Sequence, residues 1–356
     1  MITCCRPQWI CSWVWRFSET LRPEGDTINL KFHLNLSGLQ FFSTVHTSSE
    51  KEWFNEDCDH RPRCDGLLYG AKLSTAAEVV LVGRTAAQVD AINEHGVTVK
   101  RDGQEIVYPV PAILSGTAAD PVDLVILFTK AYATEAALEQ NRQLIGSRTM
   151  LLTLQNGAGH EEILRKFVDE SRVLIGTTMQ GSGRENSHAI VHSGLGDTNI
   201  GSFAESFDGQ EQIKAVFEQA GFPLNISSNI RQVVWEKLVV NASSSVLSGV
   251  LNVPQGFLAE SESAWELCQE LVREVCRAAE SEGCHLDPAF QIERVRNNLV
   301  HAPQGVPSIT ADLRNGRKTE VDFISGAVVR AAHKNKIEVP VQETMVRLVH
   351  AMEARN

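Results

Sequence analysis

The chain has 356 residues, of which 43% are hydrophobic and 22% are charged, and its formal net charge is −11. This length exceeds what one hydrophobic core normally organises, so we expect two domains. The apolar fraction is too high for a disordered chain, and no apolar run reaches the roughly 18 residues that a membrane-spanning helix needs. The acidic balance argues against a nucleic-acid-binding protein, because such proteins need basic surface against phosphates. We therefore expect a folded protein with neither a nucleic-acid nor a membrane partner.

The first 60 residues differ in composition from the rest of the chain. The first 65 residues hold five of the eight cysteines and four of the six tryptophans, including a Cys4–Cys5 pair. No cysteine spacing there matches an established zinc site, so we expect no metal. The initial apolar stretch is interrupted by Arg6 and Pro7, which is untypical of a secretory signal and favours a cytoplasmic protein. Alternating apolar and polar residues predict one strand here, over 28–36.

From residue 66 onward, strand patterns alternate with helix patterns. The patterns predict strands at 79–82, 123–129, 149–154 and 173–178, a hairpin at 97–108, and helices at 67–77, 85–95, 131–140 and 160–168. The run 123–129 is continuously apolar, as in a strand that is buried on both faces of a parallel sheet. The alternation indicates an α/β fold with a Rossmann-type, doubly wound parallel sheet.

Beyond residue 228 almost every segment has the 3.6-residue period of a helix. The predicted helices cover 230–251, 262–282, 289–300, 319–334 and 341–354, with prolines between them. Cys268, Cys276 and Cys284 recur at eight-residue spacing, which suits buried thiols on one helix face. We therefore divide the chain into an atypical segment 1–60, an α/β domain 61–228 and an all-helical domain 229–356. A cleft between two domains is the default place for a ligand.

The glycine-rich loop of a dinucleotide-binding fold is only partly present. Gly66 opens a helix, as the third glycine of Gly-x-Gly-x-x-Gly does, but Arg61 and Arg63 stand where the first two glycines belong. No apolar strand directly precedes this motif, so the first strand of the sheet is expected to be damaged or replaced. Arg84 ends the next strand. An arginine there suits the 2′-phosphate of NADP, although a solvated strand-end arginine is an equal alternative.

Two later strands end in polar side chains. Lys130 follows the buried strand 123–129, and Asn156 follows the strand 149–154 in a glycine-lined turn. The carboxyl ends of parallel strands form the ligand-binding edge of such sheets. Both residues are therefore candidates for ligand contacts, whereas the simpler interpretation of each is a turn at a strand exit.

The helical half contains a polar stripe on an otherwise apolar helix. Lys237, Asn241 and Ser245 recur at i, i+4 and i+8, while Trp235 and Leu238 lie on other faces. If that helix is buried, these polar groups must be paired with protein, water or ligand. A stripe that faces solvent is the alternative.

A second polar segment near the C-terminus runs from Ser308, before a turn, to Glu320. We expect Glu320 to enter a helix whose first turn favours negative charge, and a plain helix start is the alternative interpretation. His188 and His192 have the i, i+4 spacing of metal ligands, but their surroundings indicate a strand, so we expect no metal.

Four segments together resemble the ketopantoate reductase (2-dehydropantoate 2-reductase) family, over about residues 66–352. They are Thr-Lys130-Ala-Tyr, Leu-Gln-Asn156-Gly, the helix Trp-Glu-Lys237-Leu with Asn241, and the segment from Ser308 to Glu320. The resemblance implies NADPH-dependent reduction of a small-molecule 2-oxo acid, 2-dehydropantoate to pantoate, in pantothenate and coenzyme A biosynthesis. The residue roles it implies are a catalytic Lys237 that donates a proton to the ketone oxygen, substrate contacts at Asn241, Ser245 and Ser308, and NADP contacts at Gly66, Arg84, Lys130, Asn156 and Glu320.

The chain departs from the family pattern at three places. Ser245 and Gln255 stand where the family carries asparagine, and the shorter Ser245 leaves room for a bulkier acid, so a paralogous dehydrogenase of a bulkier 2-hydroxy acid is one alternative. A catalytically silent relative that acts as a binding module is another, because the glycine-rich loop is broken. We attribute residues 1–60 to a frame-shifted or mis-assigned start, with a divergent variant as the second explanation. The expected assembly is a homodimer.

Overall fold

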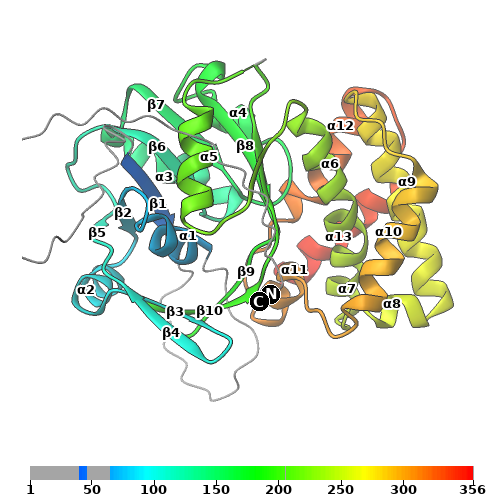
Figure 1. The fold of residues 1–356 in the computed structure, drawn as a ribbon. Helices are drawn as coiled ribbons and strands as arrows, with labels where there is room; N and C mark the ends of the chain where they lie inside the picture. Colours follow the sequence, from blue (N-terminus) through cyan, green and yellow to red (C-terminus); the bar gives the residue numbers. More distant parts are fainter. Residues whose placement is uncertain (1–39, 46–64, 205, 356) are drawn as a thin grey trace, which may run out of the picture. The chain divides into compact units, whose positions relative to one another are not determined.

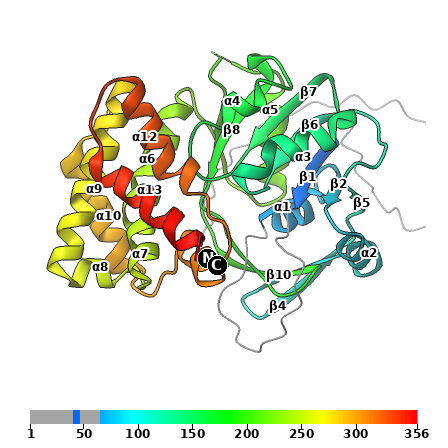
Figure 2. The same cartoon turned by 180° about the vertical axis from the view of Figure 1, so that it is seen from behind.

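A computed structural model of the chain describes residues 40–45, 65–204 and 206–355. All of these residues belong to one compact unit, Leu36–Asn356. Figure 1 shows strands with flanking helices as far as β8 and α5, and beside them a group of helices from α6 to α13. The reverse view in Figure 2 shows the same separation into an α/β part and a helical part. The predicted strand at 28–36 lies outside the described residues.

The α/β part is built on an eight-stranded sheet with the order β12-β11-β8-β7-β6-β1-β2-β5. All neighbours are parallel except β11 and β8, which are antiparallel. The strands are β1 (Gln40–Val45), β2 (Glu78–Gly83), β5 (Ala112–Leu114), β6 (Val122–Leu127), β7 (Ile145–Thr153), β8 (Val173–Thr178), β11 (Thr198–Gly201) and β12 (Leu224–Ile226). This topology confirms the doubly wound, Rossmann-type sheet.

The first strand of the sheet is replaced by a segment from further upstream. β1 lies between β2 and β6, with Phe42 paired to Val80 on one side and to Val125 on the other. The strand was not predicted, because its sequence Gln-Phe-Phe-Ser-Thr-Val has no clean period-two pattern and no glycine-rich loop directly after it. Residues 46–64, which connect β1 to the next helix, lie outside the described part.

Four helices of the α/β part follow the predicted positions, with ends that differ by a few residues, and a fifth, α5, was not predicted. They are α1 (Asp65–Leu73), α2 (Ala86–His95), α3 (Thr134–Gln140), α4 (His160–Leu164) and α5 (Gln210–Gln219), with 3₁₀ turns η1 (Ala131–Ala133), η2 (Arg142–Leu144) and η3 (Glu170–Arg172). Gly70 lets α1 pack closely on β2, because a Cβ there would overlap the Leu81 side chain. Tyr69, fully buried on the same helix, pairs its hydroxyl with Thr178 at 2.6 Å and Thr198 at 2.7 Å.

A second sheet of four strands has the order β4-β3-β10-β9. Its strands are β3 (Val97–Arg101), β4 (Gln104–Tyr108), β9 (Gly181–Arg184) and β10 (Ala189–Gly194). The predicted hairpin is β3 and β4, with Asp102 and Gly103 in the left-handed region at the turn. His192 is a buried residue of β10, as the strand interpretation predicted, and its Nε2 lies 2.8 Å from the Gln180 Oε1. The structure groups no three metal-ligating side chains within its described ranges.

The helical part begins with one long run and continues through shorter helices. It comprises α6 (Ile230–Val240), the π-helical segment η4 (Asn241–Ser245), α7 (Val246–Leu251), α8 (Phe257–Glu260), α9 (Glu262–Ser281), α10 (Pro288–His301), α11 (Ser308–Arg314), η5 (Val321–Phe323), α12 (Ser325–Lys334) and α13 (Pro340–Glu353). Cys268, Cys276 and Cys284 are free and buried, as predicted, but Cys284 follows the end of α9 and does not share a helix face with the other two. Across the part of the chain that the structure covers, no helix is both long and apolar enough to cross a membrane.

The predicted helix over 319–334 is wrong at its start, because α12 begins only at Ser325. Glu320 therefore does not lie in the first turn of a helix. Its carboxylate instead accepts a hydrogen bond from the Ala131 backbone N–H at 3.1 Å, and the Phe323 carbonyl accepts one from Ala158 at 2.9 Å. The Glu320 carboxylate and the Phe323 carbonyl are thus bonded to the α/β part. The chain therefore forms the 3₁₀ turn η5 at this point, and helix α12 begins only after it.

Candidate functional site

A large cavity of about 960 Å³ lies between the α/β part and the helical part. Its wall is made by the ends of β7 and β8, by β9 and β10 of the second sheet, by the α6–η4 run and by the start of α11. The carboxyl ends of the parallel strands open into it, as expected for a ligand site in this class of sheet.

Lys237 reaches the cavity from α6, and its ammonium group is fixed against the end of β8. Its Nζ donates a hydrogen bond to the Thr178 carbonyl at 2.7 Å. Trp235, Leu238 and Val239 on the other faces of the helix are buried in the core of the helical part. The apolar faces of α6 therefore fix the direction in which Lys237 points.

The other two members of the polar stripe also line the cavity. Asn241 and Ser245 lie one and two turns after Lys237, and both contribute to the wall. The Asn241 Nδ2 is buried and finds no acceptor among the described residues, which leaves it available to a ligand. The stripe thus faces the cavity rather than bulk solvent. The segment Asn241–Ser245 is π-helical, a local widening of the helix that occurs frequently at functional sites.

Ser308 and Asn156 approach the same cavity from opposite sides. Ser308 is the first residue of α11 and lines the wall next to Pro307. Asn156 follows β7 and is 7% exposed. The turn after it needs Gly157, which has φ +102° and no room for a side chain, because a Cβ would overlap the Phe323 carbonyl.

Lys130 lies in a buried cluster of charges next to the cavity. Its Nζ is 2.6 Å from the Asp312 carboxylate and 3.6 Å from that of Glu320, and Arg317 lies 3.3 Å from Asp312. The two carboxylates are about 5% exposed or less. Burial of this kind requires that each charge has an opposite partner. Lys130 comes from the α/β part and the other three come from the helical part, so the cluster also joins the two.

The residues proposed as a group from the sequence are thus divided between two neighbouring places. Lys237, Asn241, Ser245, Ser308 and Asn156 line the large cavity, whereas Lys130 and Glu320 lie in the charge cluster. Sequence reasoning missed Asp312 and Arg317. Asp312 lies four residues after Ser308 on α11, and that i, i+4 spacing was the available signal.

Arg84 and Gly66 occupy separate positions. Arg84 is exposed after β2 and lines a smaller cavity of about 80 Å³ together with Thr129 and Asn141. Gly66 is buried in the first turn of α1. Its neighbour Asp65, which was not a candidate, lines the large cavity.

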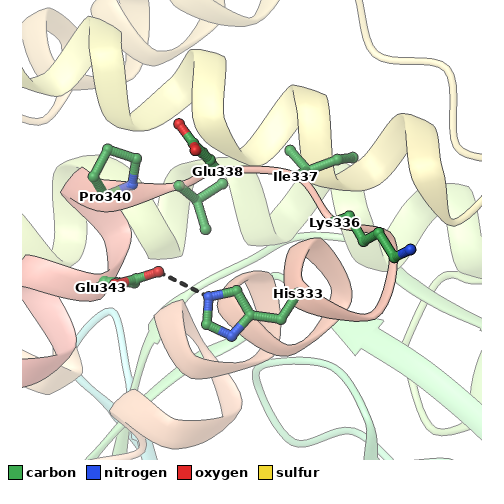
Figure 3. A pocket seen from close by; sticks show the side chains of 7 residues that line it. His333, Lys336, Ile337, Glu338, Pro340 and Glu343 are labelled. Atoms are coloured by element: carbon green, nitrogen blue, oxygen red, sulfur yellow. Dashed lines mark hydrogen bonds and ion pairs between the residues drawn. The ribbon is translucent and has the colours of Figure 1, made fainter.

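A further cavity, of about 440 Å³, lies at the turn between α12 and α13. Figure 3 shows His333 and Glu343 pointing toward one another, with 2.8 Å between Nε2 and Oε1, while Lys336 extends away from them. None of the candidate residues from the sequence lines this cavity. It therefore plays no part in the site described above.

Comparison with known proteins relates most of the described chain to one family. Residues 66–205 match the family described as ketopantoate reductase PanE/ApbA, and residues 229–353 match its C-terminal part. The chain is 31% identical to the 2-dehydropantoate 2-reductase of Streptococcus pyogenes serotype M6, over 81% of this chain and 95% of that protein. It is 33% identical to the enzyme of the same name from Halobacterium salinarum, over 80% and 92% of the two chains.

Solved structures show the same fold. The chain resembles D-mandelate dehydrogenase in its ternary structure with NADH and anilino(oxo)acetate, with a TM-score of 0.78 and 28% identity over 89% of this chain and 98% of that one. It also resembles 2-dehydropantoate 2-reductase from Geobacter metallireducens, with a TM-score of 0.77 and 24% identity over 88% and 99% of the two chains.

Proposed function

This chain belongs to the ketopantoate reductase family, and we propose that it reduces a 2-oxo acid with NADPH, the substrate being 2-dehydropantoate and the product pantoate. One observation carries the proposal. A single cavity brings Lys237, Asn241 and Ser308 of the helical part together with Asn156 at the carboxyl edge of the sheet. A cation, amides and a hydroxyl around one cavity are the groups that recognise a carboxylate and a neighbouring carbonyl.

Lys237 is proposed as the proton donor. NADPH, when bound, supplies the hydride that reduces the carbonyl carbon. Negative charge then develops on the ketone oxygen, and the Lys237 ammonium both stabilises that charge and transfers a proton to it, which gives the hydroxyl group. The hydrogen bond from Lys237 to the Thr178 carbonyl holds the ammonium group at the sheet edge before a substrate arrives.

The residues at the sheet edge fit a dinucleotide cofactor. We propose that Arg84, which follows β2 and lines the smaller cavity, binds the 2′-phosphate of NADPH, because an arginine at this strand end suits that group. Asn156, which precedes the turn at Gly157, lines the cavity, and the unpaired Asn241 Nδ2 is a free donor in the opposite wall. We propose that Lys130 and Glu320 position the ribose groups from the charge cluster, and that Gly66 begins the helix against which the diphosphate lies.

A second candidate substrate class is a 2-oxo acid with a bulky apolar group. Met179 and Val306 line the cavity and are 63% and 40% exposed, which is unusual for large apolar side chains without a partner. Ser245, 8% exposed, leaves more space in the wall than an asparagine would. The resemblance to a D-mandelate dehydrogenase structure supports this candidate.

A panel of substrates tests both candidates. Purified protein is given NADPH or NADH with 2-dehydropantoate, with 2-oxo-2-phenylacetate and with small 2-oxo acids, and loss of the reduced cofactor is followed by absorbance. We expect the highest kcat/KM with NADPH and 2-dehydropantoate. A preference for the phenyl acid would favour the second candidate. The absence of turnover with every acid and both cofactors would contradict the enzyme proposal and favour a silent relative.

A further inference from the structure

Among the described residues, the charges that line the large cavity balance one another. Among the lining residues that the structure describes, Asp65 and Lys237 are the two that carry a charge at neutral pH. Lys130 nearby adds no net positive charge, because Asp312 and Glu320 both face it. A site for an anionic cofactor and an anionic substrate normally has an excess of positive charge.

Asp65 occupies the position where the negative groups of a dinucleotide approach. It is the first residue of α1, the helix that follows the central strand β1. In doubly wound sheets the diphosphate lies against this helix, because its first backbone N–H groups point toward the ligand. The Ser182 hydroxyl of β9 donates a hydrogen bond to the Asp65 Oδ1 at 2.8 Å, which holds the carboxylate at the cavity wall.

We propose that the Asp65 carboxylate opposes the diphosphate of the cofactor, and that this one residue keeps the affinity of the chain for NADPH low. The inference rests on the proposed function. Two like charges in a partly buried site repel each other strongly, because the surroundings screen them less than water does. The carboxylate also competes with the diphosphate for the positive end of α1.

The test is a calorimetric titration of the full-length protein and its Asp65→Asn variant with NADPH. We expect the variant to bind NADPH at least about tenfold more tightly, a ratio that corresponds to about 1.4 kcal/mol. The gain should shrink as salt is added. Asp90→Asn is the matched control, because it removes the same charge from an exposed position on α2, and its NADPH affinity should equal that of the wild type.

Two further measurements separate the charge effect from other causes. Adenosine 2′-monophosphate, which has no diphosphate, should bind the wild type and Asp65→Asn equally well. Asp65→Ser repeats the test with a residue that also suits a helix start, should the asparagine variant fold poorly. Equal or weaker NADPH binding in both variants would overturn the inference while leaving the proposed function intact. Failure of every protein, wild type included, to bind NADPH would overturn the proposed function as well.

Discussion

At the scale of single residues, His160 fixes the turn that presents Asn156. Its ring is buried, stacks on Phe323 with centroids 5.1 Å apart, and places Nε2 3.0 Å from the Asn156 carbonyl. A carbonyl oxygen can only accept a hydrogen bond, so Nε2 carries the proton and Nδ1 is unprotonated in the neutral ring. Burial lowers the pKa of His160 below its ordinary value of 6.5.

The stability of the protein should therefore depend on pH through this residue. Because the folded pKa of His160 lies below the unfolded value, the unfolded chain binds more protons as the pH falls. The contribution of His160 is complete above about pH 6.5 and is lost as the pH falls below it. We expect the free energy of unfolding to fall more steeply in the wild type than in His160→Gln between about pH 7.5 and about pH 5.5, as measured by urea denaturation.

The comparison of the wild type with His160→Gln separates the effect of His160 on stability from that of the other histidines. The pKa values of His188 and His192 are also lowered by burial, but both residues are present in both proteins and their effects cancel. Parallel pH profiles for wild type and variant would show that His160 is not the titrating group.

At the scale of elements, Glu274 of α9 holds the start of α13. Its carboxylate is 1% exposed and accepts hydrogen bonds from the Val341 N–H at 3.1 Å and the Gln342 N–H at 2.7 Å, directly after Pro340. The first N–H groups of a helix have no partner within the helix, and a buried acceptor there replaces water.

Replacing this carboxylate should destabilise the packing of α13 on α9. Glu274→Gln puts an amide N–H donor where two N–H groups need acceptors, so we expect a loss of about 1–3 kcal/mol in the free energy of unfolding. Glu270→Gln on the same helix, at a position 41% exposed, is the control and should change stability by less than about 0.5 kcal/mol. Equal losses in the two variants would contradict the capping role.

Elements with strong periodicity were predictable from the sequence, and elements set by distant contacts were not. The apolar run at β6 and the long helix α9 were both predicted, because burial imposes their patterns. β1 escaped prediction because only its neighbours in the sheet make it a strand. The late start of α12 depends on hydrogen bonds from Ala131 and Ala158, which lie far away in sequence.

At the scale of the whole molecule, the candidate site exists only where the α/β part meets the helical part. Lys237 contacts Thr178 across this junction, and Lys130 contacts Asp312. Helical spacing could predict that Lys237, Asn241 and Ser245 share one face, and strand order could place Asn156 at the ligand edge. No sequence pattern could show that Asp65 and Ser182 meet in the wall of the same cavity, because that contact depends on how the second sheet is placed.

The role of Lys237 tests this account most directly. Steady-state turnover with NADPH and the best acid of the panel should fall at least about 10²-fold in Lys237→Ala, because the developing oxyanion loses its proton donor. NADPH binding should change little, and Lys334→Ala, at a side chain 73% exposed on α12, should turn over like the wild type. A Lys237→Ala enzyme that folds, binds NADPH and keeps wild-type turnover would contradict the assignment of this cavity as the active site.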